Sequence, residues 1–207
     1  MIKVQDEGES CSLWLARSGK ANALTETMLR DIAKAVSDAA ARNAKVLILL
    51  GEGKVFSAGA DLDEMKAGLG KSPAWEAATG AIATFPGLTI AALNGTLAGG
   101  AMGLALACDL RIAVPSAQFF YPVMRLGYLP QPSDPARLAA LVGPARARMI
   151  LLAGQRIGAE DALSWGLIDR IVPNEFLHDA AKTLAADALG ADQSHLWALK
   201  QMTAGQP

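Results

Sequence analysis

Two glycine-containing turns could present backbone amides to a ligand. One turn lies at residues 56–61, soon after the apolar run at residues 46–50, and the other is Gly99-Gly100, after the apolar run at residues 89–93. Glycine adopts positive φ and lets the backbone approach a ligand closely. Two amides aimed at one carbonyl oxygen would stabilise the charge that develops there in a reaction, and loss of one donor costs about 2.7–4 kcal/mol. The turns therefore indicate carbonyl polarisation, but similar turns also occur as purely structural features of α/β proteins.

Other catalytic motifs fail on spacing or composition. Residues 51–54 lack the gap and the following Ser or Thr of a phosphate-binding loop, and residues 99–103 do not match the dinucleotide fingerprint. No Gly-x-Ser-x-Gly elbow is present. The two histidines, His178 and His195, belong to the expected C-terminal helices, so we predict neither a metal site nor a Ser/His/Asp triad.

The elements that would position these turns alternate between strand and helix. Helical spacing of apolar residues over residues 25–42 predicts a helix capped by Thr25. Continuous apolar runs predict buried strands, and a small-residue helix should lead from Gly99 to about Cys108. We therefore predict an α/β fold. The expected strands are residues 12–16, 46–50, 89–93 and 110–114.

The last quarter of the chain has a helical pattern. Pro144 suits a first helical position and Gly154 the position past a helix end. Further helices are expected at residues 159–165, 175–189 and 195–202. We divide the chain into a core at residues 1–143 and a helical region at residues 144–207.

Composition excludes several functional classes. The chain has 207 residues, of which 52% are hydrophobic, and 19 basic residues balance 20 acidic ones. This balance gives no reason to expect nucleic acid or an anionic membrane as a partner. Cys11 and Cys108 form no disulfide framework, and the N-terminus has no apolar signal region, so we expect a cytoplasmic protein.

The two turns stand in a series of segments that resembles the enoyl-CoA hydratase/isomerase (crotonase) superfamily. The segments follow the family's order and together cover nearly the whole chain. This resemblance implies a spiral of strand-strand-helix units with a C-terminal helical region, and a homotrimer or hexamer. The matching segments are residues 20–24, 51–61, 91–95, 99–100, 104–112, 126–130, 142–143 and 155–173.

The resemblance also assigns site residues. It implies that the amides of Ala60 and Gly100 form an oxyanion hole for the carbonyl of an acyl-CoA thioester. Coenzyme A would be part of the substrate, with no permanently bound cofactor. The implied contacts along the coenzyme A and acyl site are Lys20, Ala21, Ala23, Ala58, Asp61, Leu62, Gly99, Val123 and Gln131. The charge of Lys20 suits a phosphate contact, and the alternative is a solvated surface lysine.

Three positions depart from the family's catalytic pattern. The two glutamates of the hydratases correspond to Gly103 and Val123, and the carboxylate of some isomerases corresponds to Gln131. None of these three can transfer a proton, so hydration by two glutamates is not expected. Asp134 is the remaining carboxylate nearby, either as a catalytic group or as a turn-forming loop residue between Ser133 and Pro135. Tyr121 and Tyr128 are hydrogen-bond donors or packing residues.

We therefore expect an acyl-CoA enzyme that uses oxyanion stabilisation for isomerisation, decarboxylation or thioester hydrolysis. The alternative is a non-catalytic acyl-CoA-binding homologue that has kept the pocket. The sequence also ends soon after residues 194–202, so we expect a shortened C-terminal helical region relative to the family.

Overall fold

Two β-sheets carry the fold of the computed structural model, which describes residues 1–203. The larger sheet has the strand order β1-β2-β3-β5-β7-β10, and the smaller has the order β4-β6-β8-β9. The strands of the larger sheet are β1 (Ile2–Glu7), β2 (Ser10–Leu15), β3 (Val46–Gly51), β5 (Leu88–Leu93), β7 (Leu110–Ala113) and β10 (Arg170–Ile171). Those of the smaller sheet are β4 (Val55–Ser57), β6 (Thr96–Ala98), β8 (Gln118–Phe120) and β9 (Ile157–Gly158).

The centre of the larger sheet is parallel and follows from continuous apolar sequence. β3 is buried along its whole length and pairs in parallel with β2 on one side and β5 on the other, while β7 continues the sheet beyond β5. Continuous apolar runs suit strands that are covered on both faces. The four strands predicted from the sequence are confirmed.

Strands alternate between the two sheets as the chain advances. β3 leads into β4, β5 into β6 and β7 into β8, with the first of each pair in the larger sheet and the second in the smaller. Helical segments follow each pair, which confirms the spiral of strand-strand-helix units. Because β4, β6 and β8 are parallel neighbours, the turns that follow them lie at the same edge of the smaller sheet.

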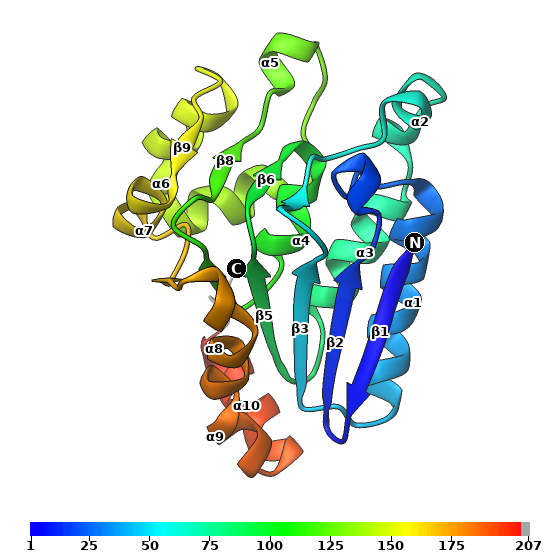
Figure 1. Ribbon diagram of the computed structural model, residues 1–207, viewed down its shortest axis with the longest axis vertical. Helices are drawn as coiled ribbons and strands as arrows, with labels where there is room; N and C mark the ends of the chain where they lie inside the picture. Colours follow the sequence, from blue (N-terminus) through cyan, green and yellow to red (C-terminus); the bar gives the residue numbers. More distant parts are fainter. Residues whose placement is uncertain (204–207) are drawn as a thin grey trace.

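Helices cover the sheets and complete one hydrophobic core. In α1 the Thr25 side chain accepts a hydrogen bond from the Met28 amide, which confirms the predicted N-cap. α1 and α3 pack side by side next to the larger sheet (Figure 1). The α-helices are α1 (Glu26–Ala41), α2 (Leu62–Lys66), α3 (Ala74–Ala83), α4 (Met102–Leu106), α5 (Val123–Leu126), α6 (Asp134–Leu151), α7 (Ala159–Trp165), α8 (Leu177–Leu184), α9 (Ala186–Gly190) and α10 (Gln193–Thr203).

The C-terminal region differs in detail from the sequence-based expectation. The helix expected to begin at Pro144 is the second half of α6, which starts at Asp134 and is kinked at Gly143, where φ is 80°. The helix expected over residues 175–189 is interrupted and forms α8 and α9. β9 pairs with β8 and β10 with β7, so this region also contributes a strand to each sheet. Within residues 1–203, no helix has the length and apolar character needed to cross a membrane.

Candidate functional site

The two glycine turns touch each other at the edge of the smaller sheet. Gly59 follows β4 with φ +100°, and Gly99 follows β6 with φ +55°. A Cβ atom built on Gly59 would lie 2.9 Å from the carbonyl oxygen of Ala98, and one built on Gly99 would lie 3.7 Å from Cα of Gly59. The close contact and the positive φ values require glycine at Gly59 and favour it at Gly99. The next residue of each turn, Ala60 or Gly100, is thereby brought to the same place.

The amide of Ala60 points away from its neighbouring segment. The Leu24 amide donates to the Gly59 carbonyl at 2.8 Å, and the Asp61 amide donates to the Leu24 carbonyl at 2.8 Å. In such a parallel bridge Leu24 uses the groups on either side of Ala60, so the N–H of Ala60 faces the opposite direction. Among residues 1–203 this amide has no hydrogen-bond acceptor.

The amide of Gly100 lies at a helix start. Gly100 is the second residue of the short 3-10 helix η3 (Gly99–Ala101), which leads directly into α4. Amides in the first turn of a helix have no intrahelical acceptor, and the N-cap residue Ala98 offers no side-chain bond. Both amides are therefore available to an oxygen atom of a ligand.

Trp75 of α3 lies directly against Gly100. A Cβ atom at Gly100 would lie 2.9 Å from the indole ring. The ring is fully buried, and its N–H donates to the Leu69 carbonyl at 2.9 Å. Trp75 therefore fixes one side of the Gly100 turn and excludes any larger residue there.

A carboxyl group occupies the space beside Gly103. A Cβ atom at Gly103 would lie 2.5 Å from Oδ1 and 3.0 Å from Oδ2 of Asp134, the first residue of α6. Gly103 follows Gly100 by three residues, which places both on the same face of a helix and about 5 Å apart along its axis. The carboxyl group of Asp134 thus lies about one helical turn from the Gly100 amide.

Asp134 is buried and only partly hydrogen-bonded. Its Oδ2 accepts from the Tyr121 hydroxyl at 2.8 Å, whereas its Oδ1 has no partner within residues 1–203. Burial raises the pKa of Asp134 to about 6; the charge of Glu76 adds to the increase, and Tyr121 and Arg137 oppose it. Burial and the neighbouring Asp134 raise the pKa of Tyr121, so its hydroxyl remains a donor. The alternative that Asp134 is a turn-forming loop residue does not hold, because this residue begins a helix and is buried.

Most of the residues predicted to contact coenzyme A lie on two adjacent segments. Residues 20–24 run beside residues 58–61, and the Ala58 amide donates to the Ala21 carbonyl at 2.9 Å. Lys20, Ala58 and Leu62 are exposed, and Ala21 and Ala23 are half-buried. The structure therefore brings this predicted set together.

Asp61 has a structural role within that set. Its carboxylate caps α2 by accepting from the Asp63 and Glu64 amides, and it accepts from Arg17 at 2.6 Å. The hydrogen bond from Arg17 holds the pKa of Asp61 below its usual value. Its contacts inside the protein do not depend on a ligand.

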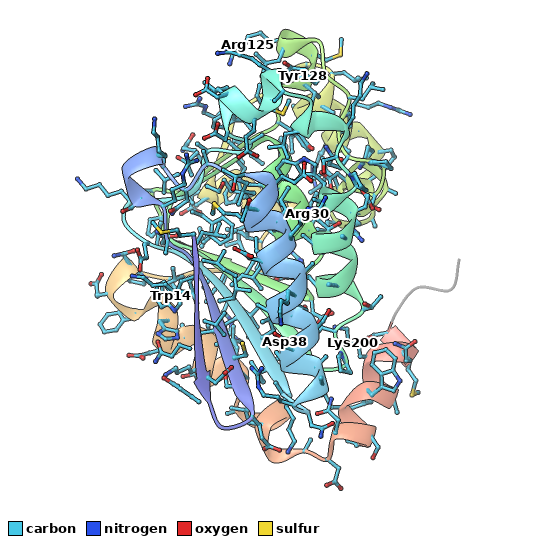
Figure 2. All side chains as sticks on the ribbon, turned by 90° about the vertical axis from the view of Figure 1, so that its right-hand side faces the viewer. Trp14, Arg30, Asp38, Arg125, Tyr128 and Lys200 are labelled. Carbon is cyan, nitrogen blue, oxygen red and sulfur yellow. The ribbon has the colours of Figure 1, made fainter. Side chains whose placement is uncertain are left out.

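The remaining predicted residues are spread around the start of α5 and α6. The Val123 side chain is buried at the start of α5. The Gln131 side chain donates to the Gly70 carbonyl at 3.2 Å, and its amide donates to the Tyr121 hydroxyl at 3.4 Å. Tyr128 is half-exposed at the end of the molecule (Figure 2), so it does not share the environment of Tyr121.

Sequence reasoning missed three residues that shape this region. In α3, Trp75 contacts Gly100 and Glu76 contacts Ser133. No local sequence motif indicates either contact. Asn22 is fully buried with φ 53°, and its amide group donates to the Glu52 and Val55 carbonyls. Asn adopts the left-handed region more readily than most residues, so the residue type of Asn22 is itself a turn signal in the sequence. Within residues 1–203, no cluster of His, Cys, Asp and Glu is arranged to hold a metal ion.

The strand-strand-helix spiral, with its two touching turns, is the crotonase fold. The sequence matches the model of the family described as "Enoyl-CoA hydratase/isomerase" over residues 7–206, and the chain belongs to this family. It resembles the carnitinyl-CoA dehydratases of Citrobacter koseri and Escherichia coli K12, with 36% identity over 168 residues in each case. These alignments cover 76% of this chain and 62% of each relative, so the chain spans less than two thirds of their length.

Solved structures show the same architecture. An enoyl-CoA hydratase from Bacillus anthracis superposes with a TM-score of 0.89 and 30% identity, covering 97% of this chain and 81% of that one. An enoyl-CoA hydratase/carnithine racemase from Magnetospirillum magneticum superposes with a TM-score of 0.90 and 27% identity, covering 98% and 79%. The fold predicted from the sequence is therefore confirmed.

Proposed function

We propose that the protein binds acyl-CoA thioesters with the carbonyl oxygen between the amides of Ala60 and Gly100. Within residues 1–203 both amides lack a hydrogen-bond acceptor, and both sit on turns that touch at Gly59 and Gly99. Two such donors stabilise an enolate oxygen without reorganising, because the backbone already holds them in place. Coenzyme A enters as part of the substrate, and the proposed chemistry uses no further cofactor.

We further propose that Asp134 is the proton-transfer group. The observation that carries this proposal is the position of its carboxyl group, which occupies the space directly beside Gly103. The family position that bears a glutamate in hydratases, as the resemblance implies, is glycine here, and a carboxyl group from α6 fills the vacated volume. With a pKa of about 6, Asp134 is mostly ionised at neutral pH and is ready to accept a proton.

A single carboxylate suits a proton shift between two carbon atoms of the acyl group. In the isomerisation of a 3-enoyl to a 2-enoyl thioester, the Asp134 carboxylate would take a proton from the α carbon. The electron pair would be delocalised onto the carbonyl oxygen held by Ala60 and Gly100. Protonated Asp134 would then return the proton to the γ carbon as the double bond moves. This sequence balances without a second acid or base.

Dehydration of a 3-hydroxyacyl thioester is the second candidate, and the similarity to carnitinyl-CoA dehydratases favours it. Here the same carboxyl group would remove the α proton and then protonate the hydroxyl group that leaves the β carbon. The two reactions differ in substrate and not in the residues used.

A panel of thioesters tests the proposal. We expect turnover of 3-enoyl-CoA or 3-hydroxyacyl-CoA substrates, with kcat/KM rising with pH through a midpoint near the Asp134 pKa of about 6. Asp134→Asn should lower kcat by roughly 10²–10⁴-fold and leave the Kd for acyl-CoA nearly unchanged. Binding without turnover of any substrate would identify a non-catalytic acyl-CoA-binding protein. Absence of acyl-CoA binding would overturn the proposal as a whole.

A further inference from the structure

Glu76 holds the start of the helix that carries Asp134. The Ser133 amide donates to Oε1 of Glu76 at 3.1 Å, and the Ser133 hydroxyl donates to Oε2. Ser133 is the N-cap of α6, and its side chain makes no capping bond to its own helix. Both carboxylate oxygens of Glu76, which belongs to α3, therefore serve the residue directly before Asp134.

The negative charge of Glu76 stabilises the start of α6 and disfavours ionisation of Asp134. A negative charge near a helix N-terminus interacts well with the helix dipole and with free amides. Burial raises the pKa of the Asp134 carboxyl, and the nearby charge of Glu76 raises it further. Among residues 1–203, the charged and titratable groups that face Asp134 are Tyr121, Arg137 and Glu76. Glu76 is the only one of these that opposes ionisation of the aspartate.

The preceding residue on α3 contacts the other half of the site. The Trp75 ring lies against Gly100, and its indole N–H is anchored to Leu69. Trp75 and Glu76 are consecutive, so one turn of α3 contacts both Gly100 and Ser133, the residue before Asp134. The relative position of these two halves is set by α3.

We propose that Glu76 is a positioning residue that fixes Asp134 relative to the Gly100 amide and thereby sets the geometry of proton transfer. This inference rests on the proposed function, in which Asp134 moves a proton at an acyl group held by that amide. Misplacement of a reacting group by about 1 Å can cost roughly 100-fold in rate.

Two variants separate the hydrogen bonds of Glu76 from its charge. Glu76→Gln keeps an acceptor for the Ser133 amide and removes the charge, so kcat should stay within about threefold of wild type. Glu76→Ala removes the cap, so kcat should fall by roughly 10- to 100-fold while KM changes little. Ser133→Ala, which keeps its amide, should have an intermediate effect on kcat.

Ionisation of Asp134 provides a second readout, because it reports how close the Glu76 charge lies to the Asp134 carboxyl. The ¹³C resonance of the Asp134 carboxyl, assigned by its loss in Asp134→Asn, would be titrated in the wild type and in Glu76→Gln. Removal of the neighbouring charge should move the titration midpoint to lower pH.

The outcomes distinguish this inference from the proposed function. If Asp134→Asn loses activity but both Glu76 variants retain wild-type kcat and the wild-type midpoint, the positioning role is wrong and the function stands. If Glu76→Gln moves the midpoint but no thioester is turned over by any form, the proposed function is wrong and the coupling of Glu76 to Asp134 stands. A fall in thermal stability of Glu76→Ala with unchanged kcat would also overturn the positioning role.

Discussion

At the residue scale, the Asp134 carboxyl is unusual because it is buried at 1% exposure and leaves Oδ1 without a partner among residues 1–203. Burial of a carboxylate that is not fully hydrogen-bonded opposes folding. Groups of this kind, with a pKa displaced by burial, concentrate at functional sites. A catalytic role explains Asp134 better than a packing role does, because an apolar residue would pack there without this loss.

The stability of Asp134→Asn relative to wild type should depend on pH. The folded pKa of about 6 lies above the usual value of 3.8, so the folded protein binds this proton more tightly than the unfolded chain does. The wild type should therefore lose stability as pH rises from 4 to 7, by roughly 1–3 kcal/mol from this group. Urea unfolding at several pH values measures the difference in the free energy of unfolding between wild type and Asp134→Asn. A difference that stays constant from pH 4 to 7 would contradict a raised pKa of the buried carboxyl.

Gly103→Ala should disturb Asp134 directly. The new methyl group would lie 2.5 Å from Oδ1, so Asp134 must shift. Such overpacking lowers the free energy of unfolding by about 1–3 kcal/mol. We expect lower stability and a fall in kcat. The matched control is Gly80→Ala in α3, where nothing lies within 4 Å and helix propensity should add up to about 1 kcal/mol of stability. Equal activity of the two variants would mean that Asp134 is not where catalysis requires it.

At the element scale, the contact between the two turns is what places the amides of Ala60 and Gly100 together. Gly59→Ala would put a methyl group 2.9 Å from the Ala98 carbonyl, at a φ of +100°. We expect weaker acyl-CoA binding and lower kcat, because the turns must separate. Gly68→Ala is the control, since Gly68 has a φ of +106° and open space around it. It should lose stability only through strain in the backbone, with acyl-CoA binding measured by calorimetry unchanged.

The elements differ in how well the sequence predicts them. β3 and β5 were predictable because each is a continuous apolar run, and α1 because its apolar spacing and Thr25 cap agree. β4, β6 and β8 have three residues each, too few for a periodic pattern. Asp134 could be named as a candidate carboxylate from the sequence, but its position beside Gly103 was not predictable, because only the tertiary fold brings the start of α6 next to α4. The absence of glutamate at Gly103, by contrast, was visible in the sequence.

At the scale of the whole molecule, the predicted assembly into trimers or pairs of trimers stays a prediction. Exposed apolar side chains cluster on α5 and the loop after it, at Met124, Leu126 and Leu129. Arg125 and Tyr128 of this segment lie at one end of the molecule (Figure 2). Exposed apolar groups of this kind mark interaction surfaces when they are contiguous.

Light scattering after size-exclusion chromatography measures the assembly. We expect a mass about three or six times the 21.5 kDa of one chain. Leu129→Asp should shift the mass toward that of a single chain if this segment lies in the interface. A single-chain mass for the wild type at micromolar concentration would contradict the predicted assembly.

The proposed site as a whole joins two backbone amides, from the turns that follow β4 and β6, to one carboxyl group from α6. A crystal structure with a non-reactive acyl-CoA analogue measures this arrangement directly. We predict the thioester oxygen at about 2.7–3.1 Å from the amide nitrogens of both Ala60 and Gly100, with the Asp134 carboxyl facing the α carbon. A thioester oxygen bound elsewhere, or an acyl group that leaves Asp134 without contact, would contradict the proposed function.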